Sequence, residues 1–125
     1  MEILQGIDLL EVERIKKLYL NYENKFLKKI LTDNEIKQIK KNQKIYYKIA
    51  GKFSAKEAVA KAIGTGFSDG IKIKDIEIIN LKNGKPIINL HGKAKIRMGN
   101  IESSSISISN DGGFVVSVAT FFMKN

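Results

Sequence analysis

The sequence contains no cysteine and no tryptophan, and it has one proline and one histidine among its 125 residues. Without cysteine, the chain has neither a disulfide framework nor a thiolate that could act as nucleophile or metal ligand. Any metal chemistry must therefore use oxygen ligands or His91. Oxygen ligands favour hard cations.

Long apolar runs are also missing. The start of the chain, Met1 to Gly6, lacks the basic segment and the apolar run of a secretory signal. No stretch approaches the roughly 18 consecutive apolar residues that span a bilayer. We therefore expect a cytoplasmic protein that has no membrane partner.

The composition is that of a folded protein. Hydrophobic residues make up 43% of the chain and charged residues 28%, which differs from the composition of disordered proteins. A chain of this length buries roughly two-thirds of its extended surface on folding, enough for one core. We expect a single domain that covers residues 1–125.

Positive charge dominates the surface chemistry. The formal net charge is +9, and the basic residues are 20 lysines and two arginines, Arg14 and Arg97. Such a charge attracts acidic proteins, nucleic acid or anionic lipid without choosing between them. A lysine-rich solvated surface explains the same number equally well.

The N-terminal residues predict a strand followed by a helix. Glu2 to Asp8 is short and apolar enough for a strand, and the apolar residues from Leu10 to Leu18 have helical spacing. Asp8 would then lie at the junction, where an aspartate commonly caps the helix that follows.

Two further helices are expected before residue 64. Thr32 and Glu35 have the spacing of a capping box, which predicts a helix from there to about Lys41. The segment from about Lys44 to Ile63 has no proline and is rich in alanine and lysine, so it should form the longest helix.

After Gly70 the pattern changes to alternation. Apolar and polar residues alternate over residues 71–78, which predicts strands with one buried face, although Asp75 interrupts the register. Asn83-Gly84 precedes a second apolar segment, Pro86 to Leu90, and this dipeptide favours a tight type I′ hairpin turn.

The C-terminal third predicts a short helix and two more strands. The helix falls near Lys93 to Met98, and the strands are Ser103 to Ser109 and Phe114 to Met123, joined by residues 110–113. The fold class is therefore α+β, with helices packed on a mostly antiparallel sheet.

Glu57 is the most informative residue of the long helix. At 100° per residue, its face is otherwise apolar or small: Tyr46, Ala50, Phe53, Ala60 and Gly64. A carboxylate buried there needs a cation, which could be a metal or Lys61, four residues further along the helix.

A second carboxylate could complete a metal site. If Asp8 converges with Glu57, the two carboxylates form a typical Mg²⁺ site, in which water and substrate phosphate supply the remaining ligands. Magnesium would in turn imply phosphate chemistry. The helix-cap role of Asp8 stays open as the alternative.

The glycine pair Gly64-Thr65-Gly66 has two interpretations. It could bring backbone amides close to a phosphate, or it could end the long helix with left-handed residues. It is not a Walker loop, because the Gly-Lys-Ser/Thr ending is absent.

Two segments together resemble a known family. Gly6-Ile7-Asp8 with Arg14 six residues after the aspartate, and Phe53 to Gly66 with the sequence FSAKEAVAKAIGTG, resemble the signatures of the holo-acyl-carrier-protein synthases. Further matches are Leu31 to Glu35, Asp75 to Ile78, Asn83 to Pro86 and Ser107 to Ser109. The resemblance, within the phosphopantetheinyl transferase superfamily, covers essentially the whole chain.

The resemblance implies a fold, a reaction and a set of site residues. The fold is that of the 4′-phosphopantetheinyl transferases, and the reaction moves phosphopantetheine from coenzyme A to a serine of an acyl carrier protein, for fatty acid biosynthesis. Adenosine 3′,5′-bisphosphate leaves. Mg²⁺ binds to Asp8 and Glu57, and Lys61 lies near the phosphates, which makes these three residues catalytic. Further coenzyme A contacts are implied for Lys56, Gly64, Thr65, Gly66, Asn83, Gly84, Lys85, Pro86 and Asn110.

The resemblance also implies partners. Arg14 matches an arginine that docks an acidic helix of the carrier protein, and an arginine can pair a carboxylate through two parallel hydrogen bonds. Members of this short type are commonly homotrimers with active sites between subunits. The last strand has apolar residues on both faces, more than one small core covers, which agrees with an interface between copies.

One position departs from the family pattern. Asn110 stands where many members have a histidine that contacts a coenzyme A phosphate, and an amide cannot become cationic. We expect weaker coenzyme A binding or a compensating lysine, with activity retained. His91 is not at the matching position and is expected at the surface or at a strand end.

Two alternatives remain at this point. A basic nucleic-acid-binding domain would fit the charge, but the sequence shows no recognition motif of that class and would leave Glu57 unexplained. We therefore expect no nucleic-acid partner. A carrier-binding homologue without transfer activity is the second alternative, and the retained Asp8, Glu57 and Lys61 argue against it.

Overall fold

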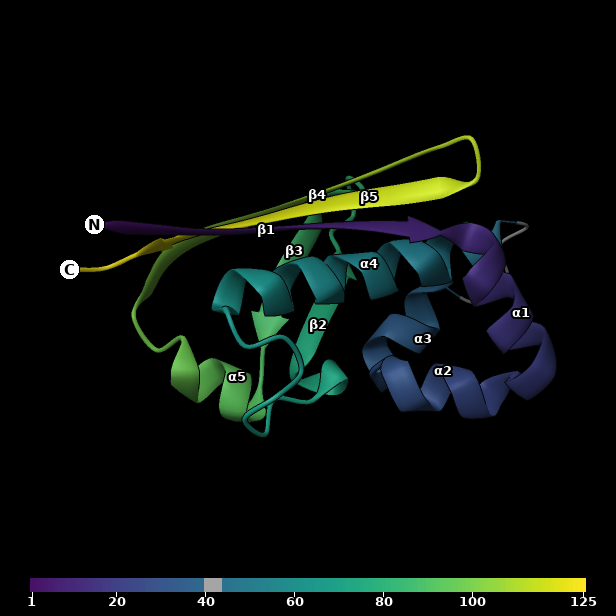
Figure 1. Cartoon of the computed structure of the whole chain (residues 1–125), viewed down its shortest axis with the longest axis horizontal. Helices are drawn as coiled ribbons and strands as arrows, with labels where there is room; N and C mark the ends of the chain where they lie inside the picture. The colour runs from purple at the N-terminus through teal and green to yellow at the C-terminus, as the bar shows by residue number, and fades with distance from the viewer. Residues whose placement is uncertain (40–43) are drawn as a thin grey trace.

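The computed structural model describes residues 1–39 and 44–125 (Figure 1). The elements in chain order are β1 (Glu2–Glu11), α1 (Val12–Tyr22), α2 (Asn24–Ile30), α3 (Asp33–Ile39), α4 (Ile45–Ile63), the 3₁₀ turn η1 (Ile73–Asp75), β2 (Ile76–Asn80), β3 (Pro86–Leu90), α5 (Gly92–Arg97), β4 (Ile101–Asp111) and β5 (Phe114–Met123). This arrangement confirms the α+β class.

The long strands form one antiparallel sheet in the order β1-β5-β4, and a separate hairpin pairs β2 with β3. In Figure 1 all labelled helices lie on one side of the three-stranded sheet, with α4 directly beneath it. Because the termini are neighbours in β1 and β5, both ends of the chain lie at the same end of the molecule.

Small residues let α4 lie close to the sheet. A Cβ added to Gly6 would lie 2.0 Å from the carbonyl oxygen of Ala58, so β1 can cross the helix there only at a glycine. Ala58, Ala62 and Ala119 are also buried in this contact region. The backbone of α4 is thereby fixed against the strand that carries Asp8.

The apolar core has two parts, and α4 contributes to both. One part lies under the sheet and extends to the β2–β3 hairpin and α5, with Val59, Ile76 and Phe121 among its buried residues. The other lies among α1, α2 and α3, with Ile15 and Leu31 nearly inaccessible to solvent. The long helix is therefore buried on most of its circumference.

The strand-to-helix junction expected at Asp8 was wrong. β1 continues to Glu11 because every residue from Glu2 to Glu11 pairs with β5, and α1 begins only at Val12. Asp8 therefore lies inside a strand and does not cap a helix. Its side chain belongs to the inward face, between the buried Gly6 and Leu10.

Two expectations for the middle of the chain were also wrong. Residues 71–75 are not a strand, because Ile73–Asp75 forms a 3₁₀ turn and pairing begins at Ile76. The Asn83-Gly84 turn is not type I′, which needs positive φ at both central residues: Gly84 has a φ of 90°, whereas Asn83 does not have a positive φ. Positive φ at two successive residues occurs instead at Gly112 and Gly113, between β4 and β5.

Other expectations are confirmed. The capping box forms, since Thr32 N–H donates to Glu35 at 2.8 Å and Glu35 N–H donates to Thr32 Oγ1 at 3.2 Å. The helix that follows is α3, and its expected extension to Lys41 lies outside the described residues. α4, α5 and the two C-terminal strands fall where the sequence places them.

The outer face of the three-stranded sheet carries apolar side chains. On β1, Ile3, Ile7 and Leu9 are 60%, 60% and 67% exposed. Their partners on β5 include Phe122, Val118 and Val116. Because the helices cover the opposite face, this patch is open in a single copy of the chain. Among the described helices, none is both long and apolar enough to cross a membrane.

Candidate functional site

Asp8 and Glu57 come together where α4 passes under β1. Lys61, which the sequence offered as one possible cation for Glu57, has its Nζ 3.3 Å from Asp8 Oδ1 and donates to the Ile7 carbonyl at 3.0 Å. Burial raises the pKa of Glu57, the negative charge of Asp8 raises it further, and Lys61 lowers it. One lysine therefore lies beside two carboxylates whose charges repel each other.

This donor set fits a hard divalent cation. Two neighbouring carboxylates repel each other, and a cation bound between them removes that repulsion. Mg²⁺ is commonly held by one or two carboxylates plus water and phosphate. Within residues 1–39 and 44–125, no group of three or more acidic, histidine or cysteine side chains converges on a point. A metal bound here would thus keep several positions open for substrate.

Gly64, Thr65 and Gly66 end α4. Gly64 has a φ of 96° and Gly66 a φ of 60°, and their N–H groups donate to carbonyl oxygens of the last helical turn. Thr65 Oγ1 donates to the Gly66 carbonyl at 2.9 Å. Because these two glycine N–H groups donate to the helix, the structure favours the interpretation of Gly64-Thr65-Gly66 as a helix C-cap. This loop starts three residues after Lys61.

Lys56 does not join Asp8 and Glu57. Its side chain is 0% exposed and its Nζ lies 2.6 Å from Glu35 Oε1, with a further hydrogen bond of 2.8 Å to the Ile30 carbonyl. Burial lowers the pKa of Lys56, against the opposing effect of Glu35. The ammonium of Lys56 is enclosed by protein and holds α4 to α2 and α3, so in this structure it has no exposed surface with which to meet the expected coenzyme A.

Glu35 has a second role besides the helix cap, and the sequence alone did not reveal it. Its other oxygen accepts from the Ile78 N–H at 2.8 Å, so one carboxylate joins α3, α4 and β2. Thr32 Oγ1 also donates to Glu77, which contacts His91 at 3.2 Å. His91 is half exposed and follows β3 directly, as expected for a histidine at a strand end.

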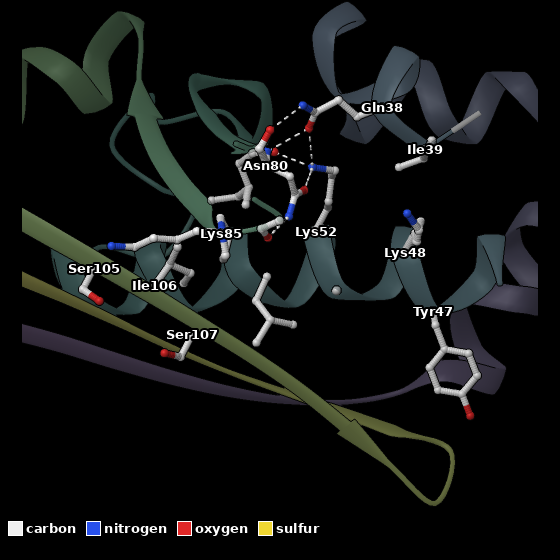
Figure 2. A pocket seen from close by; sticks show the side chains of 15 residues that line it. Gln38, Ile39, Tyr47, Lys48, Lys52, Asn80, Lys85, Ser105, Ile106 and Ser107 are labelled. Carbon is white, nitrogen blue, oxygen red and sulfur yellow. Dashed lines mark hydrogen bonds between the residues drawn. The ribbon is translucent and has the colours of Figure 1, made fainter. Parts of the chain in front are cut away.

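A pocket of about 480 Å³ opens between α4, the β2–β3 hairpin and β4 (Figure 2). Three of the residues expected to contact coenzyme A line it: Gly84, Lys85 and Pro86. Asn83 supports their turn, because its Oδ1 accepts from the Lys85 N–H at 3.0 Å. α4 adds two lysines to this pocket that were not expected from the sequence, Lys48 and Lys52.

Lys52 is held firmly in the pocket wall. Its Nζ donates to the Ile78 carbonyl at 2.5 Å, to Asn80 Oδ1 at 3.0 Å and to Gln38 Oε1 at 3.3 Å (Figure 2). Burial lowers its pKa from 10.5 to about 8. The i, i+4 spacing of Lys48 and Lys52 on a helix was the available sequence signal, since it places both side chains on one face.

Asn110 and Arg14 lie in other places. Asn110 is exposed near the end of β4, in a groove with Leu9 and Phe114, and is not among the residues that line the Lys52 pocket. Arg14 is exposed on α1. Four residues further along, Leu18 borders a groove of about 460 Å³ between α1 and α2, which also presents Lys25 and Lys29.

The carboxylate pair and the lysine pocket lie toward opposite edges of the sheet. Asp8 belongs to β1 at one edge, whereas the pocket is lined by Ser105 and Ser107 of β4 at the other. Within one copy β5 lies between these two strands, whereas α4 contributes to both groups through Glu57 and Lys52.

The chain is similar to known proteins over nearly its whole length. Residues 5–119 match the model of the family described as the 4′-phosphopantetheinyl transferase superfamily. A holo-[acyl-carrier-protein] synthase of Chlorobium phaeovibrioides is 40% identical over 124 residues, covering 99% of this chain and 96% of that protein. One from Caldanaerobacter subterraneus is 43% identical over 121 residues, covering 95% of this chain and 94% of that protein.

Solved structures agree with these similarities. The Helicobacter pylori holo-[acyl-carrier-protein] synthase, in complex with coenzyme A, matches with a TM-score of 0.84 and 33% identity, covering 95% of this chain and 100% of that one. The Bacillus anthracis enzyme, in complex with CoA (3′,5′-ADP), matches with a TM-score of 0.77 and 36% identity, covering 94% of each chain.

Proposed function

Because the chain belongs to the holo-[acyl-carrier-protein] synthases of the 4′-phosphopantetheinyl transferase superfamily, we propose that it transfers phosphopantetheine from coenzyme A to a serine of an apo acyl carrier protein. The serine oxygen forms a bond to the β-phosphorus, and the bond from that phosphorus to the bridging oxygen breaks. Adenosine 3′,5′-bisphosphate leaves, and the modified carrier supports fatty acid biosynthesis. The observation that carries this proposal is the convergence of Asp8, Glu57 and Lys61.

Asp8 and Glu57 would hold Mg²⁺ through carboxylate oxygens. Bound there, Mg²⁺ neutralises charge on the diphosphate and so lowers the barrier to attack. Lys61 adds a positive charge next to the same position. The repulsion from Asp8, which helps to raise the pKa of Glu57, would be relieved by a cation between the two carboxylates. A carboxylate or a water beside the metal would take the serine proton.

The Lys52 pocket suits the nucleotide end of coenzyme A. Lys48, Lys52 and Lys85 supply positive charge for a phosphate, and Gly84 and Pro86 offer a flat backbone wall beside it. Lys52 is already oriented by its three acceptors, so little side-chain freedom would be lost on binding. These lysines would also compensate for the neutral Asn110.

The placement of Asp8 and the Lys52 pocket at opposite edges of the sheet supports a site shared by two copies. A coenzyme A molecule whose diphosphate lies at Asp8 and whose adenosine lies in a Lys52 pocket would bridge the β1 edge of one copy and the β4 edge of the next. Contacts between different edges repeat head to tail, and they close into a ring when the rotation between successive copies completes a full turn. The exposed apolar patch of Ile3, Ile7 and Leu9 would be covered in such a ring, which we take to be a homotrimer.

The groove between α1 and α2 suits the carrier protein. Apolar Leu18 and Phe26 line the groove together with Lys25 and Lys29, and Arg14 is one helical turn away from Leu18. An acidic helix with apolar residues on one face would bury those residues in the groove and pair its carboxylates with the basic rim. This assigns part of the +9 charge to one partner.

Intact-mass spectrometry tests the proposal. Apo acyl carrier protein is incubated with this protein, coenzyme A and Mg²⁺, alongside an EDTA control and Glu57→Gln. The carrier should gain the mass of phosphopantetheine in the complete reaction and in neither control. An unmodified carrier in the complete reaction, with several apo carriers, would favour a homologue that binds carriers without transferring the group.

A further inference from the structure

Ser117 carries a buried hydroxyl with unmet hydrogen-bonding capacity. The residue lies on β5, is 0% exposed, and its Oγ has no hydrogen-bond partner among the residues that the structure describes. Buried polar side-chain atoms nearly always have a partner, and one without a partner loses its hydrogen bonds to water on folding. The hydroxyl therefore needs an explanation.

Packing explains the size of this residue but not its oxygen. α4 lies so close to the sheet that Gly6 cannot carry a Cβ, and the inward-facing residue two positions after Ser117 is Ala119, also fully buried. An alanine at position 117 would meet the same steric demand without burying a polar atom.

The neighbour across the sheet is Asp8. Asp8 and Ser117 are directly paired in the β1–β5 ladder, so their side chains point to the same face. Such pairs have Cβ atoms about 4.5 to 5.5 Å apart, which lets a hydroxyl reach a carboxylate after rotation of one side-chain bond. On its other side Ser117 pairs with Ile108, which is apolar.

The Asp8 carboxylate has a competing partner in this structure. Its Oδ1 contacts Lys61 Nζ at 3.3 Å, and Lys61 also donates to the Ile7 carbonyl. If Asp8 turned toward a cation shared with Glu57, its contact with Lys61 would be weakened or lost. The carboxylate oxygen that does not bind the cation would then need a new hydrogen-bond donor. Ser117 is the inward-facing hydroxyl next to it.

We propose that Ser117 is a positioning residue that donates a hydrogen bond to the Asp8 carboxylate when Asp8 holds a divalent cation. This inference rests on the metal site of the proposed function. Carboxylates that bind metals are generally held by such outer hydrogen bonds, and their loss weakens metal affinity. The contact would leave Lys61 free to face the substrate phosphates.

The test measures metal binding directly. Mn²⁺ prefers the same oxygen ligands, and its free concentration is followed by electron paramagnetic resonance during titration of the intact protein, with Mg²⁺ as competitor. Ser117→Ala should raise the Mn²⁺ dissociation constant about 10-fold. Its unfolding temperature should stay the same or rise, because an unpaired buried hydroxyl is removed.

Ser54→Ala is the matched control. Ser54 is also 0% exposed at this interface, but its Oγ donates at 3.4 Å to the backbone carbonyl of Asp8 rather than to the carboxylate. Ser54→Ala should have a Mn²⁺ dissociation constant within about twofold of that of the unmodified protein, since it removes no contact to a metal-binding oxygen. Wild-type affinity in Ser117→Ala, or equal weakening in both variants, would overturn the inference. Absence of Mn²⁺ binding by the unmodified protein would instead overturn the metal site itself.

Discussion

At the scale of single residues, the two buried lysines of α4 show how neighbouring positions can differ in role. Lys56 is enclosed and paired with Glu35, whereas Lys52, one turn earlier, donates to neutral oxygens at the wall of a pocket. No carboxylate pairs with Lys52 among the described residues. Its charge is therefore available to an anionic ligand, and its burial makes that charge sensitive to pH.

Coenzyme A affinity should fall as the pH rises through about 8, the lowered pKa of Lys52. Below that pH the side chain is charged and attracts phosphate, and above it the charge is lost while the phosphates of coenzyme A stay ionised. Calorimetric titration with coenzyme A between pH 7 and about 9.5 measures the change.

Lys52→Arg provides the control for this pH dependence. An arginine stays charged throughout the range, so the variant should bind coenzyme A with little dependence on pH. An identical decline in the variant and the unmodified protein would show that some other group is responsible.

At the scale of the elements, sequence patterns located helices and strands well where a local signal decides. The capping box fixed the start of α3, and composition identified α4. Asp8 was misplaced because the length of β1 is decided by pairing with β5, more than a hundred residues further along the chain. α2 was missed because its seven residues carry no capping signal and are helical chiefly through the burial of Phe26, Leu27 and Ile30.

Only the part of the candidate site that depends on local sequence signals could be predicted. Glu57 stood out because a carboxylate interrupts an apolar helical face, and that signal is local. The Glu35–Lys56 pair and the three acceptors of Lys52 depend on α3 and β2, which reach α4 only in the folded chain. No helix periodicity contains that information.

The Glu35–Lys56 pair should be important for the stability of the fold. Glu35→Gln would leave the ammonium of Lys56 buried without a counter-charge, and breaking such a buried pair typically costs about 3 to 5 kcal/mol in the free energy of unfolding. Urea unfolding at one fixed protein concentration measures the loss.

A double variant separates charge from packing. Glu35→Gln combined with Lys56→Met removes both charges and keeps the side-chain volumes similar, so it should recover part of the lost stability. A loss below about 1 kcal/mol in Glu35→Gln alone would mean that the pair contributes no more than a surface ion pair.

At the scale of the whole molecule, the arrangement of the sheet supports the proposal that the site is shared between copies. β1 and β4 lie on opposite sides of β5, so in the proposed site the Asp8 carboxylate of one copy and the Lys52 pocket of the next would serve one coenzyme A. The open apolar face of β1 and β5 provides a surface through which copies could associate. If the site is shared in this way, catalysis requires the copies to assemble.

Mixed assemblies of two damaged variants test this account most directly. Glu57→Gln impairs the carboxylate pair and Lys52→Met impairs the pocket, and the two chains are co-expressed with different tags so that assemblies containing both are purified. In a mixed ring of the proposed kind, Glu57 of one chain would face Lys52 of the other, which would restore an intact site. Transfer of phosphopantetheine to apo acyl carrier protein should therefore be recovered well above the activity of either variant alone. Mixed assemblies no more active than their parents would contradict a site built from two copies.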